Sequence, residues 1–258
     1  MDLSVTITAV LAANSLMTVF WLVSLAIHDA GIADIAWGLA FIAIAWAAYL
    51  SGDGQTPMLV AAGLTTAWAL RLAIHIGRRN LGHEEDRRYT KMREQRGGSF
   101  WFWSLFGVFL LQGVLALMVS TPLQSLAAQS PDSIGWLSWI GVAAFAVGLA
   151  FEAIGDAQLT AFKKDPSSKG QVMDRGLWKY TRHPNYFGDA TVWWALWVFA
   201  VGSGAAWWTA IGPVIMTFFL LRVSGVAMLE SDMSSRRPGY KEYMRRTSAF
   251  IPWPPRSG

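Results

Sequence analysis

The chain has 258 residues, of which 53% are hydrophobic and only 15% are charged, and its mean hydropathy is +0.34. Soluble globular domains carry about 25% charged residues, so this composition excludes an ordinary soluble protein and indicates an integral membrane protein. The absence of cysteine excludes disulfides, thiolate nucleophiles and cysteine-ligated metals. The net charge of +4 is modest, and four histidines without an HExxH pattern argue against a metal site, so we expect neither a nucleic-acid partner nor a metal.

Seven apolar segments predict an all-α protein with seven transmembrane helices. Each is near the ~20 residues that a helix needs to cross a bilayer. In chain order they are Leu3–Ile27, Ile32–Leu50, Met58–Ile76, Ser104–Leu126, Ile134–Ile154, Tyr186–Val201 and Ala205–Leu229. The first segment is too long for the apolar core of a secretory signal and lacks a basic start, so we expect it to stay in the membrane. With no internal repeat or second domain evident, residues 1–258 are predicted to form one domain.

The positive charges predict the orientation. Residues 77–103 carry seven Lys or Arg and residues 156–185 carry six, whereas the connections near 51–57, 124–133 and 202–204 carry none. By the positive-inside rule, this asymmetry places the N-terminus outside and the C-terminal tail in the cytoplasm. The polar loops are then expected to share the cytoplasmic face.

A charged and aromatic turn, RGLWKYTRHPNYFGD, lies between the fifth and sixth predicted spans. Within eight residues it supplies a fixed cation, an imidazole, an amide, a phenol and a carboxylate, and Pro184 stiffens the backbone between them. These groups belong to Arg182, His183, Asn185, Tyr186 and Asp189. The combination suits a polar, anionic cofactor. The alternative is a basic cytoplasmic loop that only obeys the positive-inside rule.

Ionisable side chains in or at the ends of the predicted spans form a second set of candidates, because such groups are costly in a membrane and usually face a cavity or a partner. Arg71 and His75 lie four residues apart, which places them on one helical face, with snorkelling toward the surface as the alternative. Glu152 and Asp156 form an acidic stripe with the same spacing. Arg222, alone in the last span, is expected to have an anionic partner.

The C-terminal tail supplies a third set of polar groups. Pro238 and Gly239 mark a turn, after which Tyr240, Tyr243 and Arg246 fit one helical face. The closing IPWPP cannot continue a helix. We expect this tail to act as a lid over a cofactor or to bind anionic lipid headgroups.

Three stretches, GLWKYTRHPNYFGD, FEAIGDAQLTAFKKD and YKEYMRRTSAFIPW, resemble the bacterial branch of the steroid 5α-reductase C-terminal-domain family, the DUF1295-like membrane reductases. DIAWGLAF and WALRLAIHIGRR are also typical of that branch, so the resemblance covers essentially the whole chain. The resemblance implies seven membrane helices and reduction by NADPH of a double bond conjugated to a ketone. It therefore predicts a multi-pass protein of the bacterial inner (plasma) membrane that takes a hydrophobic, enone-like substrate from the surrounding lipids.

The resemblance also implies which residues hold NADPH, from loops at about 77–103, 156–189 and 230–258. Lys163 stands where the reductases have an arginine, Glu152 replaces an asparagine and Glu230 replaces a tyrosine. Four other residues match the reductase pattern or are close chemical equivalents: Asp156, Asn185, Asp189 and Arg222. The complete set expected to contact the cofactor is Glu152, Asp156, Lys163, Arg182, His183, Asn185, Tyr186, Asp189, Arg222, Glu230, Tyr240 and Tyr243.

The catalytic residues are less fully matched. The reductases place a carboxylate on the second helix and a tyrosine on the third, and the same interval here links Asp34 with Trp68, so the carboxylate is present and the tyrosine is absent. Enone reduction needs a hydride and an acid or hydrogen-bond donor that polarises the carbonyl group. A carboxyl group in an apolar cavity can stay protonated for this task, so Asp34 is the predicted acid, helped by Arg71 or His75. If Asp34 only caps the second helix, the assignment moves to His75, Arg71 or Tyr89.

Two other function classes stay open. The RHPxY turn, Glu230 and the following YxxY also resemble isoprenylcysteine carboxyl methyltransferases, in which these loops hold S-adenosylmethionine. Arg222 and Lys163 suit phosphates better than a sulfonium cofactor. A non-enzymatic lipid- or sterol-binding protein is the third possibility, and it would leave the cytoplasmic polar cluster unexplained.

Overall fold

The structure, a computed structural model, describes residues 2–223, 226, 230, 233, 237 and 239–256. This part of the chain is helical and contains no β-strand, only an isolated bridge between Thr181 and Ser248. The predicted all-α class is confirmed for these residues.

Five helical segments of the described chain are long and apolar enough to cross a membrane, as a multi-pass protein requires. They are Leu3–Ile27, Ile32–Ser51, Thr56–Asn80, Arg87–Val119 and Trp136–Lys164. The sixth predicted span corresponds to a helix of 19 residues, Pro184–Gly202, and the seventh to a shorter apolar run, Trp207–Val223. Most of residues 224–229 lie outside the described residues. The count of seven spans and the orientation of the termini stay predictions.

By its internal contacts the chain divides into two compact units. The first comprises Met1–Ser138 and Leu196–Gly212, and the second comprises Trp139–Ala195 and Pro213–Gly258. The prediction of a single domain is not decided by this division, so each unit is described by itself.

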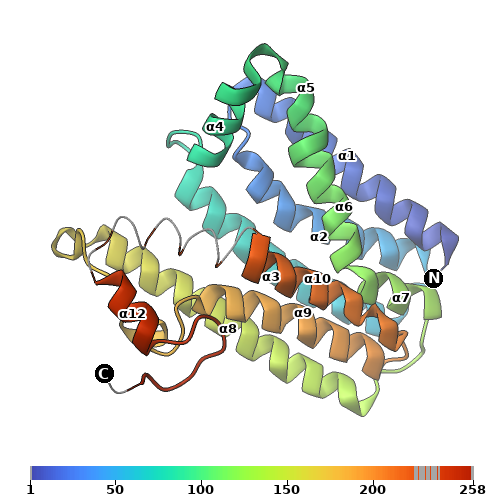
Figure 1. Ribbon diagram of the computed structural model, residues 1–258. Helices are drawn as coiled ribbons and strands as arrows, with labels where there is room; N and C mark the ends of the chain where they lie inside the picture. The colour runs from blue at the N-terminus through green and yellow to red at the C-terminus, as the bar shows by residue number, and fades with distance from the viewer. Residues whose placement is uncertain are drawn as a thin grey trace. The chain divides into compact units, whose positions relative to one another are not determined.

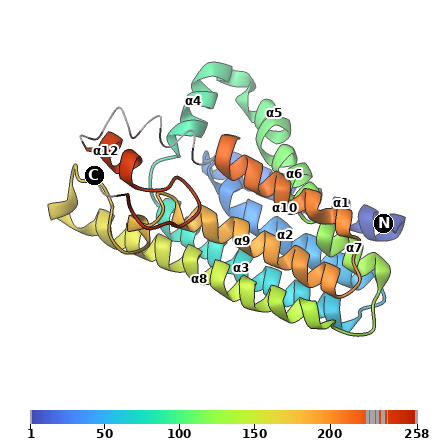
Figure 2. The ribbon, with the colours of Figure 1, turned by 60° about the horizontal axis from the view of Figure 1, so that its bottom comes forward.

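In the first unit, α1 (Leu3–Ile27), α2 (Ile32–Ser51) and α3 (Thr56–Asn80) pack side by side (Figures 1 and 2). Small residues allow the close approach: a Cβ atom on Gly38 of α2 would lie 3.0 Å from the carbonyl oxygen of Ala69 on α3. The outer face of α1 carries exposed large apolar side chains, among them Leu3, Leu11 and Leu22. Such a face fits contact with lipid.

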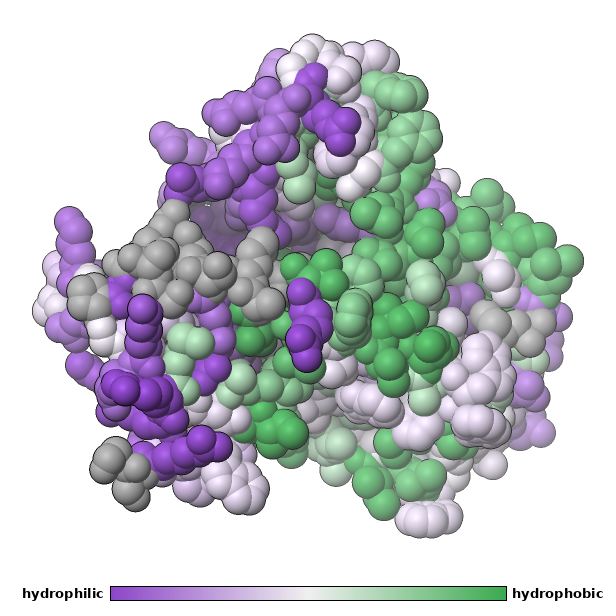
Figure 3. All heavy atoms as spheres, in the orientation of Figure 1, coloured by the Kyte–Doolittle hydropathy of each residue, from purple (hydrophilic) through white to green (hydrophobic). Residues whose placement is uncertain are grey.

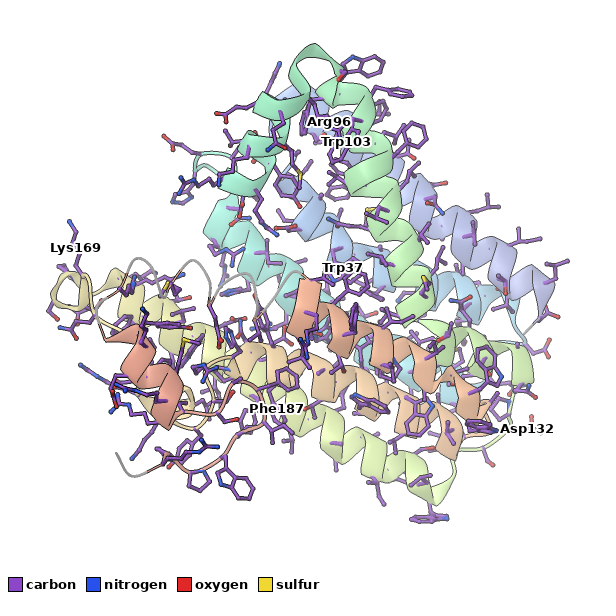
Figure 4. The ribbon with its side chains drawn as sticks, in the orientation of Figure 1. Trp37, Arg96, Trp103, Asp132, Lys169 and Phe187 are labelled. Atoms are coloured by element: carbon purple, nitrogen blue, oxygen red, sulfur yellow. The ribbon has the colours of Figure 1, made fainter. Side chains whose placement is uncertain are left out.

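The segment after α3 is more ordered than the polar loop predicted there. Asp86 accepts the backbone N–H of Arg88 and so caps a short helix, α4 (Arg87–Arg96). The chain then passes through α5 (Phe100–Ser104) and a π-helical turn (Leu105–Leu110) into α6 (Leu111–Val119). Arg96 lies 4.6 Å from the ring centroid of Trp103 (Figure 4). Hydrophilic side chains gather over α4, and hydrophobic ones cover α5 and α6 (Figure 3).

The fourth predicted span, Ser104–Leu126, is not one continuous helix. α6 ends at Val119, and α7 (Thr121–Gln129) begins after Ser120 with Pro122 in its first turn. Proline has no backbone N–H to donate to the preceding turn, so it favours a new helix start at this position.

The second unit contains most of α8 (Trp136–Lys164), the first part of α9 (Pro184–Gly202), most of α10 (Ile211–Phe218) and a π-helical turn (Phe219–Val223). The predicted span ended at Ile154, but α8 continues to Lys164. Glu152 and Asp156 therefore lie within a helix rather than at its end. The reason is that hydropathy marks where the apolar stretch stops, whereas helix hydrogen bonds continue through the polar residues that follow.

The tail forms the predicted helix, α12 (Tyr240–Arg246), preceded by Gly239 in the left-handed conformation; Pro238 lies outside the described residues. Residues 247–256, the tail loop, then run beside the segment before α9. The backbone N–H of Arg182 donates to the carbonyl of Ser248 at 2.9 Å, and the N–H of Trp253 donates to the carbonyl of Tyr180 at 2.9 Å. The loop is thereby fixed to the residues that lead into α9.

Candidate functional site

Each unit holds its own polar residues. Every residue predicted to contact the cofactor belongs to the second unit, whereas Asp34, Arg71 and His75 belong to the first. Among the described residues, no three His, Asp or Glu side chains gather in a way that could hold a metal ion.

In the first unit, the carboxylate of Asp34 is bound by two side chains of α4. Arg88 Nη2 donates to Asp34 Oδ2 at 2.6 Å, and the Tyr89 hydroxyl donates to Oδ1 at 2.7 Å. Asp34 lies in the first turn of α2, where Gly31 is the N-cap and no side chain caps the helix. The carboxylate is therefore engaged by α4, which does not fit the alternative that Asp34 caps α2.

The Arg88 guanidinium is held between two carboxylates. Besides Asp34, it contacts Asp86, with Nε 3.0 Å from Oδ1. Burial raises the pKa of Asp86, but the hydrogen bonds and charge of Arg88 outweigh it, and the net pKa lies below its usual value. Asp86 thus stays ionised at neutral pH and keeps Arg88 in place beside Asp34.

Gln112, on α6, completes this Asp34 cluster, which we define as Asp34, Asp86, Arg88, Tyr89 and Gln112. The Gln112 side chain is an electrostatic neighbour of Tyr89. Its Oε1 atom is buried and accepts no hydrogen bond within the described part of the chain. A buried amide oxygen costs free energy unless a ligand or water supplies a donor, so Gln112 offers an acceptor to a bound molecule.

Gln112 and Arg88 were not among the predicted site residues. Gln112 is a single amide in the apolar stretch LFGVFLLQGVLALMV, and a polar residue at that depth was the available signal. Arg88 and Tyr89 follow Asp86, whose capping role marks a helix start in an apparently irregular loop.

The remaining predicted catalytic residues lie on α3. Arg71 and His75 are four residues apart on this helix, and both are half-buried. Trp68, at the position where the resemblance to steroid 5α-reductases implies a tyrosine, is fully buried and packs edge-on against Phe41 with ring centroids 5.4 Å apart. Trp68 is therefore a packing residue, and the phenol beside Asp34 comes from Tyr89.

In the second unit, Arg182 ties the RHP turn to the tail. Its Nε and Nη2 atoms donate to the two carboxylate oxygens of Glu230 at 2.7 and 3.1 Å. Its Nη1 atom donates to the carbonyls of Met244 and Thr247 at 2.9 and 2.5 Å. Four of the five guanidinium N–H groups are thus committed within the protein, and the side chain is only 8% exposed.

Other predicted residues gather around Glu230. His183 Nε2 lies 3.2 Å from Glu230 Oε1, and the His183 ring stacks in parallel on Tyr186, with centroids 5.5 Å apart. Burial raises the pKa of Glu230, but hydrogen bonds from His183 and Arg182 outweigh burial and lower the net pKa. The result is an ionised carboxylate that binds both members of the RH pair. We call Arg182, His183, Tyr186 and Glu230 the Glu230 cluster.

The two tail tyrosines lie against this cluster. Burial and the charge of Glu230 raise the pKa of Tyr240 to about 12. Burial also raises the pKa of Tyr243, whose hydroxyl donates to the carbonyl of Trp178 at 2.5 Å. Both phenols are therefore neutral at physiological pH.

A further acidic group lies where α8 and α9 meet. Asn185 Nδ2 donates to Asp156 Oδ1 at 3.1 Å, and Asn185 Oδ1 is buried without a hydrogen-bond partner in the described residues. Glu152 and Asp189 are 2% and 8% exposed. These four residues, the Asp156 cluster, present acceptors to hydroxyl, amide or amine donors of a ligand.

Lys163 and Arg222 are the exposed members of the predicted set. Lys163 lies in the last turn of α8, and Arg222 lies in the π-helical turn after α10. The anionic partner expected for Arg222 stays a prediction. An exposed cation remains accessible to a phosphate, although solvent and salt weaken its attraction.

Comparisons with known proteins add relatives of largely uncharacterised function. The family model described as "protein of unknown function (DUF1295)" matches residues 20–247. The uncharacterised protein C594.04c of Schizosaccharomyces pombe is 24% identical over 229 residues, covering 76% of this chain and 63% of its own. The probable O-methyltransferase ustE of Ustilaginoidea virens is 30% identical over 112 residues, covering 36% of this chain and 39% of its own.

The chain therefore spans less than two thirds of the length of either relative. No solved structure matches it. Both relatives are fungal, and the predicted bacterial inner membrane stays a prediction. Since the family model matches most of the residues, from the first helix to the tail, this protein belongs to the DUF1295 family of proteins of unknown function.

Proposed function

We propose that this protein is an NADPH-dependent membrane reductase that acts on a conjugated carbon–carbon double bond in a steroid-like or other hydrophobic lipid. The observation that carries the proposal is the hydrogen bond between Tyr89 and Asp34. The resemblance to steroid 5α-reductases implies a carboxylate and a tyrosine together. Here the tyrosine of α3 is replaced by Trp68, and a tyrosine of α4 lies beside the carboxylate instead.

The pair suits enone chemistry. Reduction places a hydride on the β-carbon, and negative charge then develops on the carbonyl oxygen. NADPH, when bound, supplies that hydride. Tyr89 can turn its O–H from Asp34 to the carbonyl oxygen and donate the proton, while the Arg88 guanidinium stabilises the phenolate that remains. Asp34 holds Arg88 in position, and water returns a proton to Tyr89.

This scheme assigns Asp34 a different role from the neutral acid predicted from the sequence. Asp34 forms an ion pair with Arg88 at 2.6 Å, and Tyr89 already donates to it. In the proposal, Tyr89 is the catalytic donor and Asp34 is a positioning residue. Arg71 and His75 remain candidates for contact with the substrate.

The second unit offers groups that fit a nicotinamide dinucleotide. The buried Oδ1 atom of Asn185 can accept a hydrogen bond from the N–H of an amide or amine, and Asp156 and Asp189 can accept hydrogen bonds from ribose hydroxyls. Exposed Lys163 and Arg222 suit phosphates. Because Arg182 is hydrogen-bonded to Glu230 and to carbonyl groups of the tail, we assign it a structural role in this unit.

Cofactor identification tests the proposal directly. The full chain is purified in mild detergent, and co-purifying small molecules are identified by mass spectrometry, followed by titration with NADPH and S-adenosylmethionine. We expect NADPH to bind and an Asn185→Leu variant to bind it more weakly, with Asn80→Leu on α3 as the control. Binding of S-adenosylmethionine and not of NADPH would overturn the proposal.

A second candidate is an S-adenosylmethionine-dependent methyltransferase. The similarity to a probable O-methyltransferase favours it, and the buried acids of the Asp156 cluster also suit the ammonium group of that cofactor. Methyl transfer to a carboxylate, however, requires no proton donor, so the Tyr89–Asp34 pair would have no chemical role. The same titration separates the two candidates.

A further inference from the structure

The tail loop encloses a cavity that the proposed reaction does not use. The cavity has a volume of about 270 Å³ and lies between the end of α12 and the tail loop. Its lining contains four arginines, Arg182, Arg245, Arg246 and Arg256, and also includes Ser248 and Trp253. We call it the tail pocket.

The walls of the tail pocket are fixed by hydrogen bonds. The end of the loop returns to α12, where the Arg256 N–H donates to the carbonyl of Arg246 at 2.9 Å. It is held to the segment before α9 by the Thr181 hydroxyl, which donates to the carbonyl of Phe250 at 2.8 Å. Arg182 adds its bonds to the carbonyls of Met244 and Thr247. A cavity held in this way needs little ordering when a ligand binds.

The charges around the tail pocket favour an anion. Three of the four arginines have a carboxylate partner: Arg182 with Glu230, Arg245 with Glu242 and Arg246 with Asp174. Arg256 forms no ion pair with the described residues, so the lining keeps a surplus of one positive charge. The pair of Arg245 is solvent-exposed and the pair of Arg246 is partly exposed, and a phosphate can replace an exposed carboxylate at small cost.

The position of the pocket favours a membrane lipid as the source of that anion. Phe250 of the tail loop contacts Phe187, in the first turn of α9, with ring centroids 6.0 Å apart (Figure 4). The loop therefore lies beside the end of an apolar helix. In a bilayer that α9 spans, this position is at the level of the lipid headgroups. Ile251 and Trp253 are 64% and 68% exposed. Exposed tryptophan next to arginine is typical of segments at the lipid headgroups.

We propose that the tail pocket binds the phosphate group of an anionic membrane lipid. Arg256 and Arg245 contact the phosphate, and Ile251 and Trp253 enter the bilayer interface beside it. The recognised chemistry is a phosphate ester, which a free phosphate ion or a cofactor phosphate would share. The site is independent of the proposed reaction.

The test uses the full chain in detergent and two soluble short-chain lipids with the same acyl chains, phosphatidylglycerol and phosphatidylcholine. We expect wild type to bind the anionic lipid about tenfold more tightly than the zwitterionic one. Arg256→Gln should remove most of this preference, and Trp253→Ser should weaken lipid binding but not the binding of inorganic phosphate. Lys169→Gln, on the exposed loop after α8, is the control with the same charge change (Figure 4).

Other results would overturn the proposal. Equal affinities of wild type for the two lipids exclude recognition of the headgroup charge. If Arg256→Gln does not fold, Arg245→Gln takes its place, and an unchanged lipid preference there has the same meaning. Inorganic phosphate that binds more tightly than phosphatidylglycerol would make the pocket a phosphate-ion site. NADPH that displaces the lipid, with NADH unable to do so, would assign the pocket to the cofactor.

Discussion

The hydroxyl of Tyr89 donates a hydrogen bond of 2.7 Å to the carboxylate of Asp34, which lies 55 positions earlier in the chain. The contact joins a short polar helix to the start of a membrane span, and Arg88, the preceding residue, binds the other oxygen of the same carboxylate. The two donors fix the orientation of the carboxylate, and the carboxylate in turn orients the phenol before a substrate binds.

Replacing Tyr89 by Phe should lower turnover about 10²-fold, because the ring stays in place while its transferable proton is lost. Binding of NADPH should not change. The measurement is NADPH oxidation with an enone that wild type accepts, and Tyr49→Phe on α2 is the matched control. Turnover near that of wild type would show that the proton comes from another group, with His75 and Arg71 as the next residues to replace.

Gln112→Leu is expected to separate stability from activity. The substitution removes a buried oxygen that has no hydrogen-bond partner in the described residues, so the free energy of unfolding should stay the same or rise by about 1 kcal/mol. Turnover should fall several-fold, because the buried amide oxygen beside Tyr89 is no longer available to a bound molecule. If the variant instead loses stability as an ordinary core substitution does, and its turnover is unchanged, Gln112 has a structural role and no role in the reaction.

The predictions from sequence were most reliable where one physical signal was strong. Runs of apolar residues identified the first three helices nearly to their ends, and the spacing of Tyr240 and Tyr243 identified α12. The polar turn and Glu230 were singled out separately, and the structure brings them together through Arg182. These elements depend on local periodicity or on charge, both of which the sequence displays.

Contacts between distant elements were not predictable in the same way. Nothing in the sequence pairs Asp34 with Arg88 and Tyr89, because the pairing depends on a ten-residue polar helix whose propensity is weak without its cap. The break at Ser120 also went unseen, since hydropathy does not register the effect of Pro122 on the backbone. Arg222 was singled out because its neighbours are apolar; its side chain is exposed in the structure, and its anionic partner stays a prediction.

The stability of the second unit should depend on pH through Glu230. Its folded-state pKa is lowered from 4.5, so its contribution is fully present above about 4.5 and is lost as the pH falls through the lower folded value. Thermal unfolding of wild type from pH 6 to pH 3 should show this loss. Glu230→Gln should flatten the profile and cost about 3–5 kcal/mol at neutral pH, because it leaves buried Arg182 without its charge partner.

The control for this pair is Glu242→Gln, which removes a carboxylate from an exposed ion pair with Arg245. Exposed pairs contribute at most about 1 kcal/mol, so this variant should behave as wild type at every pH. An effect of equal size in both variants would point to the net charge of the tail rather than to the Glu230 cluster.

Arg222→Ala should weaken NADPH binding about three- to tenfold at low salt, since an exposed arginine interacts with a phosphate through solvent. The difference should shrink as the ionic strength rises. Lys163→Ala is expected to act in the same direction, and Lys169→Ala should have no effect. An affinity that Arg222→Ala leaves unchanged at low salt would remove Arg222 from the cofactor site.

The closest approach of α8 to α9 provides the last prediction. A Cβ atom on Gly188 of α9 would lie 2.5 Å from the backbone nitrogen of Glu152 and 2.6 Å from the carbonyl oxygen of Gly148. Both atoms are backbone atoms of α8 and cannot rotate away, so Gly188→Ala must push the helices apart. The cost of such overpacking is about 1–3 kcal/mol and exceeds the roughly 1 kcal/mol that alanine gains over glycine in a helix.

Gly63→Ala on α3 is the matched control, because nothing lies within 4 Å of a Cβ atom there and the substitution should be neutral or stabilising. Moving α9 away from Glu152 also shifts Asn185 and Asp189, which project from the same part of α9. Gly188→Ala should therefore lower both thermal stability and NADPH affinity, whereas Gly63→Ala lowers neither. If the two alanine variants unfold at the same temperature, α8 and α9 are not packed as closely as the glycine contacts indicate.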